Sequence, residues 1–188
     1  MSDKTVSENV VEGSPLFKVA ADVRIDATPL QVYSVVSDLG RSGEWSEECV
    51  GGEWVEGEPA TVGAVFRGDN HRDEDVVAWA PVVRGAWSTR SEVVAAEAGA
   101  TFAWAIQDSS GRRQESVWTF DIEAEGTGSR LIHHFRMGAP TEGIRGITAE
   151  MDAERKQAFF ADWGAKLEKD LAATVERIKD VIEGEFKS

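Results

Sequence analysis

The feature that most constrains the fold is a change of hydrophobic period along the chain. From residue 16 to about residue 138, apolar and polar side chains alternate over short segments that Gly-, Ser- and Asp-rich loops separate. From about 144 to 183, apolar residues recur at helical spacing instead, as in Phe160, Trp163 and Leu167. Alternation is typical of strands with one buried face, and the longer spacing is typical of an amphipathic helix. The sequence therefore predicts an antiparallel sheet followed by one long helix.

Start and stop signals divide the chain into expected elements. Thr28, Pro29 and Gln31 mark a helix start, with an N-cap, a proline in the first turn and a capping box. The long helix is expected to begin around Thr148, after a loop near 143–146, and to kink near Gly164. Strands are expected at 16–26, 50–55, 64–72, 87–95, 101–107, 114–124 and 129–138, and a second short helix at 41–48.

An antiparallel sheet with one apolar face needs a cover, and the C-terminal helix is the expected element long enough to supply it. We therefore expect an α+β fold, in which a curved antiparallel sheet of about seven strands wraps around that helix and two short helices follow the first strand. A length of 188 residues suits one domain. We expect residues 1–15 to form a flexible tail and residues 16–188 to form the single domain.

The charge of the chain excludes several classes of partner. Acidic residues number 34 against 20 basic ones, which gives a formal net charge of −14. Nucleic acids and anionic membranes require a basic surface, so neither is an expected partner. No apolar run approaches the roughly 20 residues of a membrane span, and residues 1–14 do not resemble a signal peptide. The expected location is therefore the cytoplasm.

The Cys and His residues favour no metal or cofactor chemistry. Cys49 follows Glu47 and Glu48, whose charges would raise its thiol pKa, so a packing or surface role is favoured over a nucleophile. With three His and one Cys, the chain has no metal-ligand spacing of the usual kinds, and we expect neither a metal nor a cofactor. Glu44, Glu47 and Glu48 are interpreted as a solvated helix edge and not as paired catalytic carboxylates.

The aromatic residues define the candidate binding site. Strand phase predicts that large rings and a few small polar side chains face the helix: Trp54, Phe66, Asn70, Trp87, Thr89, Ser91, Phe102, Trp104, Trp118, Phe120, His133 and Phe135. The helix would contribute Phe159 or Phe160, Trp163 and Leu167. These side chains could simply fill a core. A cavity is favoured, because small residues such as Gly68 and Thr89 leave gaps between the rings, and small-molecule pockets are mostly apolar with a few placed polar groups.

His133 and His134 are the most chemically reactive pair in the sequence. Adjacent strand residues point to opposite faces, so the two cannot bind one metal or act on one substrate together. The phase turns His133 inward and His134 outward. An inward histidine could be a general base. The favoured interpretation is a hydrogen-bonded core residue or a group that orients a ligand.

Several segments together resemble a known family. They include VRIDATPLQVYSVVSDLGRSGEWS, CVGGEWVEG, VGAVFRGDN, WSTRSEVVAAEAGATFAW and SVWTFDIEAEGTGSRLIHHF, and with the closing helix they cover about residues 17–183. On these segments the chain resembles the START/Bet v 1-like (SRPBCC) superfamily, in particular its actinobacterial polyketide cyclase/dehydrase branch. The resemblance implies the helix-grip fold and a large cavity for lipids, steroids, plant hormones or polyketides. The stretch 71–85 departs from the family pattern and is either a flap over the cavity or a longer hairpin loop.

Three functions are compatible with this resemblance. The first is a sequestering or carrier protein of secondary metabolism, whose partner is a bulky apolar or aromatic, polyketide- or lipid-like molecule. The second is a polyketide cyclase/dehydrase of the aromatase/cyclase type, with His133 as general base and Asn70 or Ser91 orienting a carbonyl. The third is self-sacrifice resistance to an enediyne antibiotic, with cleavage at an inward glycine such as Gly68.

The enzyme alternative is weakened by a departure from the family pattern. Members that cyclise polyketides commonly place Arg, Tyr or acidic groups in the cavity. Here Tyr33 lies on the first expected helix, and Arg67 and Arg90 fall on the outer face by strand phase. We expect a monomer or a weak homodimer.

Overall fold

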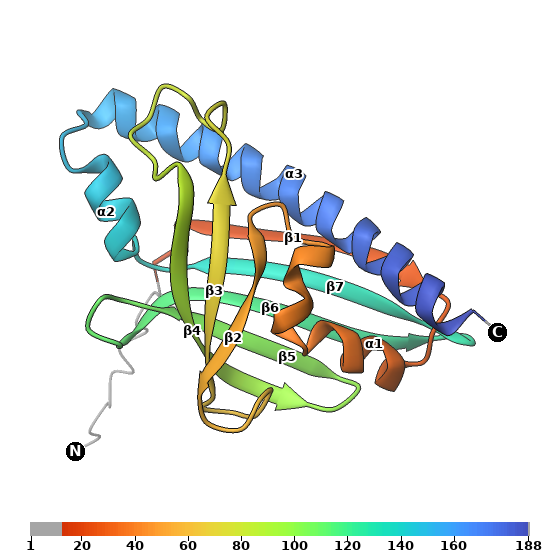
Figure 1. The fold of residues 1–188 in the computed structure, drawn as a ribbon. Helices are drawn as coiled ribbons and strands as arrows, with labels where there is room; N and C mark the ends of the chain where they lie inside the picture. The colour runs from red at the N-terminus through yellow and green to blue at the C-terminus, as the bar shows by residue number, and fades with distance from the viewer. Residues whose placement is uncertain (1–12, 188) are drawn as a thin grey trace, which may run out of the picture.

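The structure is a computed structural model, and it describes residues 13–187. In this range the chain forms a seven-stranded antiparallel sheet that curves around a long C-terminal helix (Figure 1). The strand order is β1-β7-β6-β5-β4-β3-β2. The predicted α+β helix-grip fold is confirmed. Most of the tail predicted over 1–15 lies outside the described residues, and the domain boundary stays a prediction.

The elements follow the predicted order. The strands are β1 (Phe17–Ile25), β2 (Cys49–Glu56), β3 (Val65–Arg72), β4 (Gly85–Glu97), β5 (Thr101–Gln107), β6 (Arg113–Glu125) and β7 (Gly128–Met137). The helices are α1 (Pro29–Val36), the 3-10 helix η1 (Leu39–Glu44), α2 (Glu142–Thr148) and α3 (Ala153–Phe186). In the part of the chain that the structure describes, no helix is both long and apolar enough to cross a bilayer.

The start of α1 has the predicted capping box. The backbone N–H of Gln31 donates to the Thr28 hydroxyl over 3.3 Å, and the backbone N–H of Thr28 donates to the Gln31 amide oxygen over 2.9 Å. Both bonds satisfy N–H groups that a helix start leaves without intrahelical partners. This local signal was sufficient to place the helix.

Two predicted helices differ from the structure. The segment 142–148, expected to contain a loop, forms α2, which ends at Thr148. The long helix α3 begins only after Asp152, whose carboxylate caps it by accepting from the Arg155 N–H. Gly164 does not interrupt α3, which is 34 residues or about 51 Å long. The Phe17 ring packs beside this glycine. The second short helix is η1, which begins earlier than expected because the Asp38 carboxylate caps it at Gly40.

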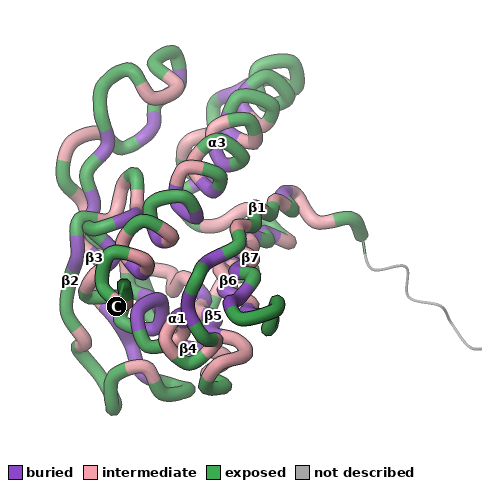
Figure 2. Tube along the Cα trace, turned by 90° about the vertical axis from the view of Figure 1, so that its right-hand side faces the viewer, coloured by how far each residue is buried: buried purple, intermediate pink, exposed green. Residues whose placement is uncertain are grey.

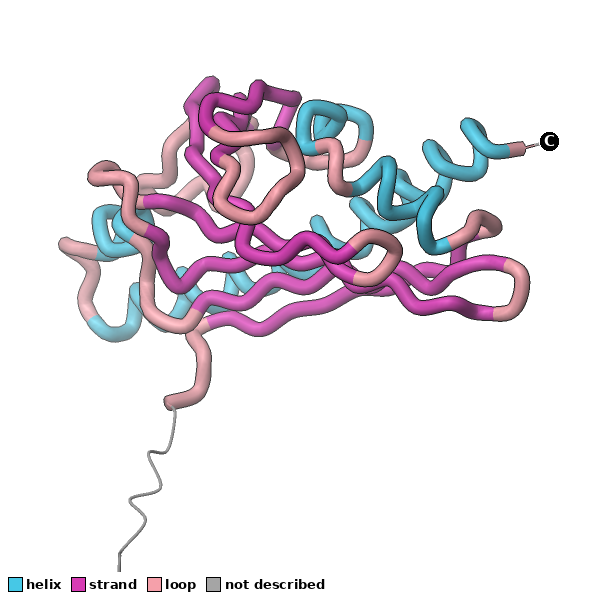
Figure 3. Tube along the Cα trace, turned by 90° about the horizontal axis from the view of Figure 1, so that it is seen from below, coloured by secondary structure: helices cyan, strands magenta, loops and turns pink. Residues whose placement is uncertain are grey.

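The helix α3 lies along one side of the curved sheet. It packs mainly against β1 and to a lesser extent against β7, and Figure 3 shows it behind the sheet layer. Buried and exposed positions alternate along the strands and wind along α3 (Figure 2), as the hydrophobic periods predict. Strands β2 to β5 make little backbone contact with α3, which β3 and β4 approach only at one end (Figure 1), so α3 does not close their inner faces to the same extent.

Candidate ligand-binding site

The strand register brings six predicted side chains into one continuous layer of rings. Across the sheet, Trp104 pairs with Trp118 and Trp118 with Phe135, while Phe102 pairs with Phe120 and Phe120 with His133. The Trp118 and Phe135 ring centres are 4.2 Å apart, as are those of Phe120 and His133. We call these residues the aromatic face: Phe102, Trp104, Trp118, Phe120, His133 and Phe135.

The two tryptophans of the aromatic face remain half-buried. Phe102 and Phe120 have almost no accessible surface, whereas Trp104 and Trp118 keep an intermediate exposure although they lie on central strands. Ile106, which points the same way further along β5, is also half-buried. By strand phase both indoles lie on the inner face of the sheet, whereas α3 packs mainly on β1 and β7.

His133 is buried within this layer and is neutral. Its exposure is 4%, and its Nδ1 lies 3.1 Å from the Thr119 carbonyl oxygen. The Phe120, Trp118 and Trp104 rings stack on it within 28° of parallel. Burial lowers the pKa of His133 to about 4, against the smaller opposing effect of the Thr119 carbonyl. An imidazole of this pKa carries no charge near neutral pH.

A cluster of four charged side chains lies beside the aromatic face, between the sheet edge and α3. The Arg72 guanidinium donates two hydrogen bonds to the Glu48 carboxylate, over 2.7 and 2.9 Å, and a third to the Val83 carbonyl over 2.9 Å. The Lys166 ammonium lies 3.0 Å from Glu48 and also pairs with Asp170. We call Glu48, Arg72, Lys166 and Asp170 the charged cluster.

Two tryptophans enclose the Arg72 guanidinium of this cluster. The Arg72 guanidinium carbon lies 4.3 Å from the ring centre of Trp87 on β4 and 5.0 Å from that of Trp163 on α3. Stacking on both rings and bidentate pairing are geometries that favour arginine over lysine. Arg72 therefore links β3, β4 and Glu48, the residue before β2, to the helix.

The carboxylates of the charged cluster respond differently to their surroundings. Burial raises the pKa of Glu48, but the hydrogen bonds from Arg72 and the charge of Lys166 outweigh it and lower the pKa overall. Burial raises the pKa of Asp170, and the nearby Glu48 and Glu47 add to the rise against the opposing effect of Lys166. Glu48 is thus held firmly as a carboxylate.

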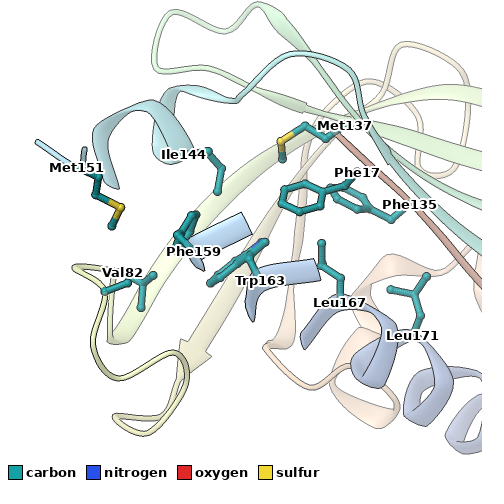
Figure 4. Packing of buried hydrophobic residues seen from close by; sticks show 11 residues of the cluster. Phe17, Val82, Phe135, Met137, Ile144, Met151, Phe159, Trp163, Leu167 and Leu171 are labelled. Carbon is teal, nitrogen blue, oxygen red and sulfur yellow. The ribbon is translucent and has the colours of Figure 1, made fainter. Parts of the chain in front are cut away.

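The loop 73–84, which departs from the family pattern, packs over the N-terminal half of α3. The Arg84 guanidinium donates to the carbonyls of Glu74, Val76, Val77, Ala80 and Val82 at 3.0 to 3.4 Å, and so fixes the loop from within. The Trp79 indole N–H donates to the Asp162 carboxylate over 2.8 Å, and its ring meets Phe159 edge-on. Ala80 and Val82 join the buried cluster around Phe159 and Trp163 (Figure 4).

Two hollows on the surface of residues 13–187 lie away from the predicted site, because no predicted site residue lines either of them. One of about 380 Å³ lies between the loop 73–84 and the α2–α3 corner, beside Trp79, Met151 and Arg155. The other, of about 330 Å³, lies among charged side chains of β1, β6 and β7. Among residues 13–187, no group of three or more His, Cys, Asp or Glu is placed to hold a metal ion.

Comparison with known proteins identifies the family. Residues 17–183 match the family described as polyketide cyclase / dehydrase and lipid transport. The chain belongs to this family. Among curated proteins none matches it.

Solved structures agree with this family. The polyketide cyclase-like protein Cgl2372 from Corynebacterium glutamicum is 26% identical, with a TM-score of 0.62 over 93% of this chain and 96% of that one. Two di-domain ARO/CYC proteins, StfQ from the steffimycin pathway and BexL from the BE-7585A pathway, are 11% and 18% identical, with TM-scores of 0.64 and 0.60. The matches to StfQ and BexL include 91% and 89% of this family member, but only 52% and 50% of the two longer di-domain chains. At these sequence identities the two structures show the fold alone.

The structure places the remaining predicted site residues of this family member around the aromatic face. Trp54 and Phe66 pack edge-on at the β2–β3 border, and Ser91 is buried between Phe66 and Ile106 in the register. Asn70 turns its amide N–H groups back to the Gly68 carbonyl and the Thr89 hydroxyl. On α3, Phe159, Trp163 and Leu167 are buried towards the sheet, whereas Phe160 is half-buried against Phe17.

One expected gap is already occupied. Gly68 lies on the inner phase of β3, but a Cβ atom added to it would lie 3.1 Å from the Thr89 hydroxyl and 3.6 Å from the Cys49 sulfur. Burial also raises the pKa of the Cys49 thiol, with a smaller contribution from Asp69, so it is a packing residue in character. The expectation that Gly68 leaves open space is wrong.

Sequence reasoning missed the charged cluster and one core tryptophan. Glu48, interpreted as part of a solvated edge, has a side chain only 23% exposed and sits between two cations. Arg72 shares its strand phase with Asn70, and Lys166 follows Trp163 by three positions on α3, so both could have been placed inward by the same rule. Trp45 is buried at 3% beside Ile178 and Ile182, because η1 turns it under α3.

Proposed function

We propose that this protein binds a bulky apolar or aromatic small molecule, polyketide- or lipid-like, against the aromatic face and beneath α3, as a sequestering or carrier protein. The observation that carries the proposal is the half-buried state of Trp104 and Trp118 at the centre of the inner face. Large rings on central strands are normally covered. Here a ligand would complete the cover that α3 does not provide.

The character of the surrounding groups supports an apolar ligand. The charges of Glu48, Arg72 and Lys166 are paired with one another, and His133 is neutral. Each 100 Å² of apolar surface that a ligand covers would contribute roughly 2.5 kcal/mol before the costs of ordering. The family, which includes polyketide cyclases and lipid transport proteins, is consistent with this ligand class.

A binding experiment with a matched pair of variants tests the proposal. Trp118 and Thr119 are neighbours on β6 that point to opposite faces. Calorimetric titration with polycyclic aromatic compounds and long-chain fatty acids should show saturable binding by the wild type. We expect Trp118→Ala to weaken that binding at least tenfold and Thr119→Ala to leave it unchanged. No binding of any compound in either class would refute the proposed function.

The cyclase alternative has one observation in its favour and one against it. Arg72 supplies an inward arginine, which was not among the predicted site residues, and it lies 8% exposed between two indoles. Against it, the low pKa of His133 makes this imidazole a weak general base at neutral pH. Product analysis after incubation with a linear poly-β-keto thioester decides between the two. Turnover that His133→Phe abolishes would favour the enzyme.

Self-sacrifice resistance receives less support from the residues around the aromatic face. The glycine proposed for cleavage, Gly68, is packed against Thr89 and Cys49. A ligand-bound radical would need direct access to its backbone hydrogen. Intact-mass measurement after incubation with an activated enediyne tests this alternative, and a chain cut at one defined position would revive it.

A further inference from the structure

We propose that His133 recognises a hydroxyl group of the ligand, its unprotonated Nε2 accepting a hydrogen bond from a phenol-type O–H. The inference rests on the proposed function and adds the chemical class of the ligand, a hydroxylated aromatic molecule. It is carried by the tautomer of the imidazole, by the direction of Nε2 and by the apolar rings around it.

The hydrogen bond of Nδ1 fixes the tautomer. Nδ1 lies 3.1 Å from the Thr119 carbonyl oxygen, which can only accept. Nδ1 therefore carries the proton and donates it. In a neutral imidazole the other nitrogen then has a free lone pair, so Nε2 is an acceptor. The burial that lowers the pKa of His133 to about 4 keeps this state across the neutral range.

The same bond sets the direction of Nε2. Nδ1 is bonded to the carbon nearest the backbone, and it faces the β6 main chain through Thr119. Nε2 lies on the far side of the five-membered ring and so points away from that strand. Within residues 13–187, Nε2 forms no hydrogen bond, although His133 is only 4% exposed.

This unpaired acceptor borders accessible space. Among the side-chain nitrogen and oxygen atoms of residues 13–187, the Arg67 Nε alone is both fully enclosed and without a partner. Nε2 of His133 has no partner either, so it is not fully enclosed. Most polar atoms in so buried a position find a partner, in the protein or in solvent. A ligand hydroxyl is a donor from which Nε2 can accept.

The surroundings select the kind of molecule that carries the hydroxyl. The rings of Phe120, Trp118 and Trp104 lie at 4.2, 5.6 and 6.3 Å from the imidazole and nearly parallel to it. Nε2 is thus a polar point in a wall of aromatic carbon. A flat ligand that stacks on the accessible indoles of Trp104 and Trp118 would meet this point at its rim, where an aromatic ring carries its hydroxyl groups.

A pair of probe ligands tests the inference. 2-Naphthol and 2-methoxynaphthalene have the same ring system, but only the first has a hydroxyl donor. We expect the wild type to bind 2-naphthol about tenfold more tightly, the effect of one additional hydrogen bond to a buried acceptor. His133→Phe keeps an aromatic ring and removes the acceptor, so it should abolish the preference and retain affinity for the ether. His134→Phe is the control, because His134 points outward and pairs with Asp121.

The outcomes separate this inference from the proposed function. Equal affinity of the wild type for the two probes would overturn the role of His133 and leave aromatic binding intact. Absence of binding by both probes and by the wider panel would instead overturn the proposed function.

A spectroscopic readout on the wild type covers the case in which His133→Phe does not fold. Nitrogen-15 shifts of the His133 ring should show a protonated Nδ1 and an unprotonated Nε2. The Nε2 shift should move with 2-naphthol and stay constant with the ether. A protonated Nε2 in the free protein would refute the inference.

Discussion

The helix α3 is held to the sheet in two different ways on its two sides. Towards β1 and β7 it packs through buried apolar side chains, among them Phe159, Leu167 and Leu171 against Phe17 and Phe135 (Figure 4). Towards β2 and β3 it is joined by the charged cluster, in which Lys166 and Asp170 of α3 meet Glu48 and Arg72.

The difference is consistent with the half-buried state of Trp104 and Trp118 in the aromatic face. Apolar packing needs direct contact, so it brings α3 close to β1 and β7. Arg and Lys have long stems, and an ion pair between their heads and a carboxylate joins elements that are further apart. The charged cluster therefore holds the far side of α3 without closing it onto β4 to β6. The two sides differ in the perturbations to which they should respond.

The largest expected effect is on the apolar side. Phe159 has no accessible surface and stacks on Trp163, so Phe159→Ala should lower the free energy of unfolding by about 3–5 kcal/mol. Phe160→Ala is the matched control, because the adjacent ring is half-buried and should cost clearly less. Urea denaturation followed by circular dichroism measures both. Equal costs would contradict the assignment of Phe159 as the apolar anchor.

A pH dependence is expected from the aromatic face. His133 has an unfolded pKa of 6.5 and a folded pKa of about 4, so between these values the unfolded chain binds the proton more readily. Stability is therefore fully present above pH 6.5 and is lost as the pH falls towards 4, by about 3 kcal/mol in total. The difference between wild type and His133→Phe in urea midpoints at pH 5, 6 and 7 should show this slope.

The control for this pH dependence is His134. His134→Phe removes a histidine that is exposed on the outer face, so the slope between pH 5 and 7 should persist. A wild-type slope that His133→Phe leaves unchanged would show that His133 is not the titrating group.

On the charged side, the expected change is smaller. Glu48→Gln leaves Arg72 and Lys166 without their shared carboxylate, and because Glu48 is 23% exposed we expect a loss of about 2–3 kcal/mol. Glu47→Gln breaks the more exposed pair with Arg177 and should cost less than about 1 kcal/mol. Thermal unfolding of both variants compares them. If Glu48→Gln cost no more than Glu47→Gln, the charged cluster would not hold α3.

The difference between the two sides also shows how far the sequence could predict the structure. The capping box of α1 and the alternation along β5 to β7 depend on neighbours in sequence, so the fold and the aromatic face were predictable. The charged cluster joins positions 48, 72 and 166, whose proximity depends on the curvature of the sheet. Charge patterns alone suggested a solvated surface for Glu48, because most carboxylates are exposed.

The start of the long helix was misplaced for a related reason. It was expected around Thr148, but residues 142–148 form α2 and the Asp152 carboxylate caps α3 further along the chain. Trp45 was not among the predicted site or core residues. Only the position of α3 over η1 determines that it is buried.

The smallest expected effect concerns the loop 73–84, which contacts α3 through Trp79 and Val82 and is fixed from within by Arg84. Trp79→Phe removes the indole N–H that donates to Asp162 but keeps a ring against Phe159. Because this contact is partly exposed, the free energy of unfolding should fall by less than about 1 kcal/mol.

Local opening of the loop should respond more than global unfolding, because the loop's internal bonds to Arg84 persist. Amide hydrogen exchange should therefore accelerate over 76–80 and stay constant in β5 to β7. Asp162→Asn retains an acceptor oxygen and should have a weaker effect in the same direction. Unchanged exchange over 76–80 in Trp79→Phe would mean that packing of Ala80 and Val82, and not the indole hydrogen bond, keeps the loop on α3.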